Sequence, residues 1–216
     1  PGSRRLDCRL SFRNTARDHR LRWNLALPWT PSVSRSGLKF NTVERAVREV
    51  DETDADSVTP VHPADHFVSV ANDEGGLALF SEFPVNYEVV PGDEPRLAVT
   101  VLRSVGMLSR TGAGPKTPTS EAQCLREFDI RFCIRPFQPS EEDELFCEAA
   151  LWRSSPMRAL AVEPRLKPVP LEEDSFQGPF VEARSGRVLV SAFKRRQTGD
   201  GTMIRLFNPF PEEQSV

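Results

Sequence analysis

Residues 67–80 read FVSVANDEGGLALF. Two apolar runs, 67–70 and 77–80, flank a turn rich in Asn, Asp and Gly, and this pattern is typical of an antiparallel hairpin. Residues 87–102 read YEVVPGDEPRLAVTVL and repeat the same arrangement around a second turn. The run at 97–102 is almost entirely apolar, as expected of a strand buried on both faces. We therefore predict that two hairpins form the centre of an all-β fold.

Two further runs lie on the N-terminal side of this centre. Residues 6–12 and 21–27 alternate apolar and polar side chains, which is the period of a half-buried strand. Because the polar residues 14–19 separate the two runs, we predict that they pair as an antiparallel hairpin.

The C-terminal half of the chain shows the same kind of pattern. Residues 128–137 alternate and predict a strand with one face in the core. Residues 188–193 and 202–207 flank a Gly-rich turn and predict a closing hairpin. Many short strands joined by turns indicate a sandwich of two sheets.

Four segments are less regular. Residues 32–37 have the composition of a loop, and residues 43–50 fit either a short helix or a strand. Ser140–Asp143 resembles a capping box ahead of an apolar run, so we predict a short helix over 145–150. Residues 163–180 are rich in Pro and predict a loose connector.

These observations predict an antiparallel β-sandwich, similar to a supersandwich, with long loops and at most one short helix. We expect a main sandwich region at residues 1–165. Residues 166–216 would hold the connector and the closing β-hairpin, packed on the same fold.

Composition excludes several classes of function. The 216 residues carry 28 Lys and Arg against 31 Asp and Glu, a net charge of −3, which disfavours a nucleic-acid partner. No apolar run is long enough to span a membrane, and no signal segment is present at the start. We therefore predict a cytoplasmic protein without a membrane partner. Because position 1 is Pro, we expect a processed chain or a piece of a longer one.

The sequence offers little support for a catalytic or metal-binding motif. No Gly-x-Ser-x-Gly elbow or phosphate-binding loop occurs. Pro63 lies between His62 and His66 and disfavours a zinc pair on one helix, and His19 is expected to be structural. The acidic residues 51–56 lack the pattern of a calcium loop. The four Cys residues form no C-x-x-C pair, so we expect buried, reduced thiols.

Six stretches together resemble the C-terminal β region of bacterial α-mannosidases of glycoside hydrolase family 38. They follow the order of that family along nearly the whole chain: Asn14–Arg22 (NTARDHRLR), His66–Val68 with Gly75–Leu79 (HFV and GGLAL), Leu97–Arg110 (LAVTVLRSVGMLSR), Thr117–Pro118 with Ala122–Cys124 (TP and AQC), Val190–Lys194 (VSAFK) and Ile204–Pro209 (IRLFNP).

The resemblance implies a C-terminal β domain, without catalytic residues of its own, of a zinc-dependent retaining α-mannosidase. In that family the zinc ion and the catalytic carboxylates belong to an N-terminal domain, and no segment here matches it. We therefore expect no catalytic or metal-binding residue and no cofactor in this chain, zinc in the parent enzyme, and an α-mannoside as the parent's substrate. This chain would pack on the N-terminal catalytic domain.

The same resemblance places a basic residue of the 106–118 loop near the substrate. Arg110 is the first candidate for substrate binding and Lys116 the second; either is otherwise a plain surface residue. Asp18–Arg22 is interpreted as a charged, structural turn.

Two other classes of function stay open. A freestanding carbohydrate-binding module would use exposed aromatic side chains to stack on sugar rings, and Trp29 and Trp152 are the candidates for that role. A structural interaction domain would instead present an apolar face to a partner.

Overall fold

The structure is a computed structural model that describes residues 4–47, 60–108, 116–154, 188–210 and 212–214. The chain divides into two compact units, Pro1–Arg153 and Ser154–Val216. The boundary predicted at residues 165 and 166 lies outside the described residues, as do the acidic patch at 51–56 and the connector at 163–180. No helix in the described part of the chain is long and apolar enough to cross a membrane.

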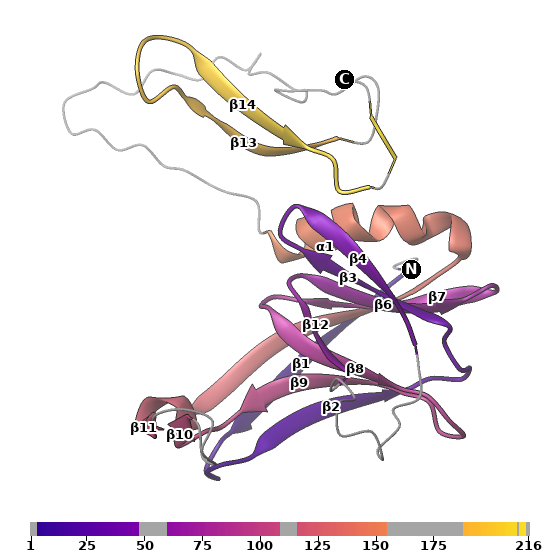
Figure 1. Cartoon of the computed structure of the whole chain (residues 1–216), viewed down its shortest axis with the longest axis vertical. Helices are drawn as coiled ribbons and strands as arrows, with labels where there is room; N and C mark the ends of the chain where they lie inside the picture. Colours follow the sequence, from indigo (N-terminus) through magenta and orange to yellow (C-terminus); the bar gives the residue numbers. More distant parts are fainter. Residues whose placement is uncertain (1–3, 48–59, 109–115, 155–187, 211, 215–216) are drawn as a thin grey trace, which may run out of the picture. The chain divides into compact units, whose positions relative to one another are not determined.

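The two larger sheets of the first unit are antiparallel and lie face to face (Figure 1). The larger sheet has six strands in the order β1 (Leu6–Arg13), β12 (Glu127–Phe137), β7 (Gly75–Ser81), β6 (Phe67–Asn72), β3 (Val33–Leu38) and β4 (Asn41–Ala46). The smaller sheet has four strands in the order β2 (Arg20–Ala26), β9 (Arg96–Arg103), β8 (Val85–Val90) and β5 (Val61–Ala64). The predicted antiparallel β-sandwich is confirmed.

The core lies between the two sheets and is built from the alternating apolar residues of both. Val68, Leu79 and Phe132 come from the larger sheet, and Tyr87 and Val99 come from the smaller one; each is at most 1% exposed. Burying such side chains is the main favourable contribution to folding.

The central hairpins of the sequence are confirmed. Strand β6 pairs with β7, and β8 pairs with β9, with turns at the predicted positions. Leu97, Ala98 and Val99 are all fully buried, so β9 is covered on both faces, as its apolar sequence indicates.

The N-terminal hairpin was predicted wrongly. Strand β1 pairs with β12 and strand β2 pairs with β9, so the two alternating runs belong to different sheets. The segment between them crosses from one sheet to the other and is fixed by Asn14. The buried side-chain amide of Asn14 donates to the carbonyl oxygens of Gln123 and Cys124, at 2.9 and 3.2 Å. Alternation predicts a strand but carries no information about its partner.

The loop predicted at residues 32–37 is instead strand β3, between β4 and β6 in the larger sheet. Gly37 is needed in this strand because neighbouring side chains fill the space around it. A Cβ atom on Gly37 would lie only 2.7–2.8 Å from ring atoms of His66 and Phe67. Residues 43–50 were expected to form either a short helix or a strand. Of these, residues 43–46 belong to strand β4.

The predicted helix is present as α1 (Leu145–Arg153), preceded by the 3₁₀ helix η2 (Pro139–Glu144). Figure 1 shows α1 on the side of the larger sheet that faces away from the smaller sheet. The capping box differs from the prediction and belongs to η2, where the backbone N–H of Gln138 donates to the carboxylate of Glu141 at 3.0 Å. The capping pair is therefore Gln138 and Glu141 rather than Ser140 and Asp143.

Helix α1 also packs on the buried ring of His66. This ring meets that of Phe146 edge-on, with 4.4 Å between the ring centroids. Burial lowers the pKa of His66, so the ring stays neutral near neutral pH.

None of the four cysteines forms a disulfide, but only Cys133 is buried. Burial raises the pKa of Cys133 to about 12, which makes it an inert core residue. The other three, Cys8, Cys124 and Cys147, are half-buried, contrary to the expectation that all four lie in the core.

The second unit contains the predicted closing hairpin, formed by β13 (Leu189–Arg195) and β14 (Thr202–Phe207). The register shifts between Val190 and Ala192, so Ser191 forms a β-bulge.

Candidate functional site at the base of the 106–118 loop

Three segments of the first unit meet where strand β9 ends. They are the crossing segment at residues 14–19, the residues that follow β9 at 104–106, and the 3₁₀ helix η1 (Ser120–Gln123). Each of them belongs to one of the stretches that carry the resemblance. Three of the six stretches therefore meet at one place in the fold.

The side chain of Gln123 connects the three segments. It is only 6% exposed. Its Oε1 atom accepts hydrogen bonds from the backbone N–H of Asp18 at 2.9 Å and from the hydroxyl of Ser104 at 3.1 Å, and its Nε2 atom donates to Asp18 Oδ1 at 3.0 Å. A buried amide that makes bonds at both ends has one orientation, so the segments have a fixed geometry.

Asp18 extends this connection to the loop. The same Oδ1 atom accepts a hydrogen bond from the backbone N–H of Gly106 at 2.7 Å. A Cβ atom on Gly106 would lie 2.4 Å from Gln123 Nε2, so a larger residue here would displace the amide from these hydrogen bonds. Asp18 itself has a φ of 51°, a left-handed conformation that Asp tolerates better than most residues.

Both ends of the loop are tied together. Strands β10 (Met107–Leu108) and β11 (Thr117–Pro118) pair antiparallel. The backbone N–H of Thr119 donates to the carbonyl oxygen of Gly106 at 3.0 Å, and its hydroxyl donates to that of Val105 at 3.0 Å. Residues 109–115 lie between these fixed ends, outside the described residues.

A polar cavity of about 570 Å³ opens beside this base. Asp18, His19, Arg20 and Arg103 line it, and the two arginines sit opposite each other on β2 and β9. His19 Nδ1 is buried and has no hydrogen-bond partner among the described residues. The cavity can therefore bind polar groups, but its lining contains no pairing of a nucleophile with a base.

The predicted substrate-binding residues fall on this loop. Lys116 is exposed and directly precedes β11, whereas Arg110 lies outside the described residues. Their proposed role stays a prediction. The structural interpretation of Asp18–Arg22 agrees with the contacts of Asp18 and with an ion pair between Arg22 and Glu88.

Sequence reasoning did not single out Ser104 or Gln123. Both are ordinary polar residue types, and only their position inside the family-like stretches hinted at a role. In the described part of the chain, no group of three or more His, Cys, Asp and Glu side chains is placed to hold a metal ion.

Of the two tryptophans proposed for sugar stacking, Trp152 is used internally. Its indole N–H donates to Asp7 Oδ1 at 2.7 Å, and the guanidinium of Arg131 lies 6.0 Å from the centre of its ring. Trp29 borders a different cavity, at the other end of β2.

The fold belongs to a class of β-sandwich that occurs within large glycoside hydrolases. An α-mannosidase from Enterococcus faecalis V583 superposes with a TM-score of 0.66 at 20% sequence identity, over 96% of this chain and 22% of the other. A family 38 glycosyl hydrolase from Enterococcus faecalis gives a TM-score of 0.67 at 20% identity, over 97% of this chain and 23% of the other.

Comparison of sequences adds a related protein. All of this chain aligns, at 28% identity over 223 positions, with 22% of a protein from Halalkalibacterium halodurans that bears the provisional name of mannosylglycerate hydrolase. No protein-family profile matches the chain. The chain spans about a fifth of the length of these relatives. The resemblance to glycoside hydrolase family 38 drawn from the motifs is thus confirmed.

The contacts of Gln123 generate a prediction about stability. We expect Gln123→Ala to lower the free energy of unfolding by about 1–3 kcal/mol, because Asp18 and Ser104 lose their hydrogen bonds to the side-chain amide. Urea unfolding followed by circular dichroism measures this. The matched control Gln197→Ala changes an exposed turn residue and is expected to stay within about 0.5 kcal/mol of the wild type. Equal effects of the two substitutions would contradict the assigned role.

Proposed function

We propose that this chain acts as a non-catalytic β domain of a longer, zinc-dependent α-mannosidase that hydrolyses α-mannosides with retention. The observation that carries the proposal is the alignment of the entire chain with only 22% of a curated relative. A retaining glycosidase needs two carboxyl groups on either side of the scissile bond. We assign these groups, and the residues that hold zinc, to the remainder of the longer protein.

In this proposal the domain presents the 106–118 loop to the substrate. The Asp18, Ser104 and Gln123 contacts hold both ends of the loop in one position, and a loop with fixed ends places its side chains more accurately than a free one. Arg110 and Lys116 would donate hydrogen bonds to hydroxyl groups of the mannoside.

A second role of the domain is to pack on the rest of the enzyme. The pairing of β13 with β14 places Val190 opposite Leu206 and Phe193 opposite Ile204. These four residues are 41–46% exposed and share one face of the hairpin. A two-stranded hairpin is marginally stable by itself in water, and an apolar patch of this kind typically marks an interface. We propose that the catalytic part of the longer protein covers it.

Because we assign the catalytic groups to the remainder of the longer protein, we predict that the 216-residue chain has no turnover. We expect no hydrolysis of a chromogenic α-mannoside above the blank, with or without added zinc, because the catalytic carboxylates lie elsewhere. The longer protein, assayed in parallel with zinc, is expected to hydrolyse the same compound. Zinc-dependent turnover by the 216-residue chain would overturn the non-catalytic assignment.

The loop residues can be tested within the longer enzyme. We expect Arg110→Ala and Lys116→Ala each to lower kcat/KM roughly tenfold or more, because a charge-assisted hydrogen bond to substrate is worth about 1.5–3 kcal/mol. The control Lys39→Ala removes another exposed lysine and is expected to leave kcat/KM unchanged. If both loop variants behave like this control, the loop does not bind substrate.

The proposed interface on the β13–β14 hairpin is tested by comparing the same variants in the longer protein and in the 216-residue chain. Ile204 lies on the apolar face, and Met203 on the opposite face is 36% exposed. We expect Ile204→Asp to destabilise the longer protein by about 2 kcal/mol or more, since a charge replaces a buried aliphatic group, and to have little effect on the 216-residue chain. Met203→Asp is the control in both proteins. Equal thermal shifts for the two variants would argue against a covered face.

A further inference from the structure

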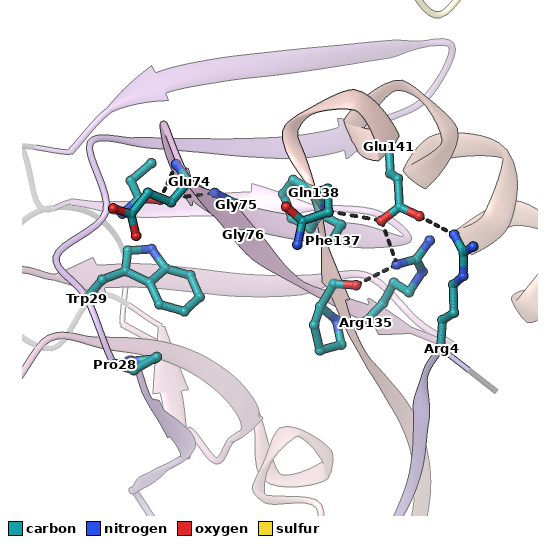
Figure 2. A pocket seen from close by; sticks show the side chains of 12 residues that line it. Arg4, Pro28, Trp29, Glu74, Gly75, Gly76, Arg135, Phe137, Gln138 and Glu141 are labelled. Atoms are coloured by element: carbon teal, nitrogen blue, oxygen red, sulfur yellow. Dashed lines mark hydrogen bonds and ion pairs between the residues drawn. The ribbon is translucent and has the colours of Figure 1, made fainter. Parts of the chain in front are cut away.

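A second cavity, of about 650 Å³, opens at the far end of strand β2 from the loop base. Figure 2 shows its two sides. Trp29 and Glu74 lie on one side, and Arg4, Arg135 and Glu141 lie on the other. Its volume falls within the range of roughly 300–1,000 Å³ that is typical of small-molecule sites.

One side of this cleft is rigid. Arg135 is only 3% exposed, and its guanidinium donates to both carboxylate oxygens of Glu148, at 2.9 and 3.1 Å, and to Glu141 at 3.3 Å. The bonds to Glu148 raise the pKa of Arg135, so it stays charged. The backbone N–H of Gln138, followed by Arg135, lowers the pKa of Glu141 and keeps it a carboxylate. The bidentate pair of Arg135 with Glu148 fixes the position of both side chains.

The floor of the cleft is also closely packed. Strands β6 and β7 turn at residues 73–74, and Phe137 lies against Gly76. A Cβ atom on Gly76 would come within 2.2 Å of Cζ of Phe137. The turn is fixed by Asn72, whose Oδ1 atom accepts the backbone N–H groups of Glu74 and Gly75 at 3.0 and 3.2 Å. The floor is therefore preformed rather than adaptable.

The groups that face a ligand are an aromatic ring and planar polar side chains. Trp29 is half-buried, Glu74 is exposed, and the Arg4 side chain is 73% exposed although it pairs with Glu141. The π face of an indole carries partial negative charge and attracts C–H groups that carry partial positive charge. Carboxylate and guanidinium groups bond to hydroxyl groups around the edge of a ring.

The charges of the lining indicate a neutral ligand. Arg4 and Arg135 balance Glu74 and Glu141, so the four charged residues that line the cleft sum to zero. A phosphate or carboxylate would meet no excess of positive charge here, unlike at an anion site. An aliphatic ligand would leave the polar groups without partners.

We propose that this cleft binds a neutral saccharide, with one sugar ring stacked on Trp29 and its hydroxyl groups bonded to Glu74. This inference goes beyond the proposed function and does not rest on it, because binding here requires neither turnover nor the remainder of a longer protein.

The test is a titration of the 216-residue chain with methyl α-D-mannopyranoside, methyl glucoside and mannobiose, followed by tryptophan fluorescence. We expect a saturable change with at least one of these neutral sugars, and no tighter binding of the charged comparator glucose 6-phosphate. Trp29→Ala is expected to abolish binding, measured by isothermal titration calorimetry because the variant lacks the fluorescent side chain of the cleft. Trp152→Ala, which removes the tryptophan on α1, is its matched control, and circular dichroism verifies that both variants are folded.

A second pair of variants keeps the proposal falsifiable if Trp29→Ala does not fold. Glu74→Gln changes an exposed side chain and is expected to weaken binding roughly tenfold, the loss of about one polar contact. Glu94→Gln, in the exposed turn between β8 and β9, is expected to leave binding unchanged. Absence of a saturable change with all three sugars overturns the proposal, and so does binding that is unaffected by both Trp29→Ala and Glu74→Gln.

Discussion

Three stretches of chain that are far apart in sequence meet around one buried amide, the side chain of Gln123. Its bonds to Asp18 and Ser104 determine where the chain crosses between sheets and where the 106–118 loop begins and ends. The two sheets account for most of the buried apolar surface, but apolar packing is not directional. The position of the loop relative to the sandwich therefore depends on this small set of oriented hydrogen bonds.

The sequence was sufficient to predict the central hairpins and the sandwich class. Residues 67–80 and 87–102 combine alternation with turn chemistry, and both signals act over short distances along the chain. Strand partners depend on distant residues, which is why β1 and β2 were paired wrongly. Strand β3 was missed for another reason: its Ser and Gly residues are typical of loops, yet Gly37 is required here because the rings of His66 and Phe67 leave no room for a side chain.

The candidate site was predicted only in outline. The motifs located the loop, and Lys116 and Arg110 followed from the resemblance. The residues that hold the loop, Ser104 and Gln123, gain their importance from contacts with Asp18 that no local pattern encodes. The Trp29 cleft combines residues from near the N-terminus, the β6–β7 turn and the end of β12. Such a combination becomes visible only when the strand order of the sheet is known.

The bulge at Ser191 determines which face of the closing hairpin the side chains of β13 point to. Val190 and Phe193 are three positions apart, so in a regular strand their side chains would point to opposite faces. The bulge absorbs the extra residue, so both side chains pair with the same side of β14. One continuous apolar surface on this hairpin therefore depends on the bulge, because the spacing of the two residues is odd. A strand that lacked residue 191 would place Val190 and Phe193 two positions apart and would form the same surface with no bulge.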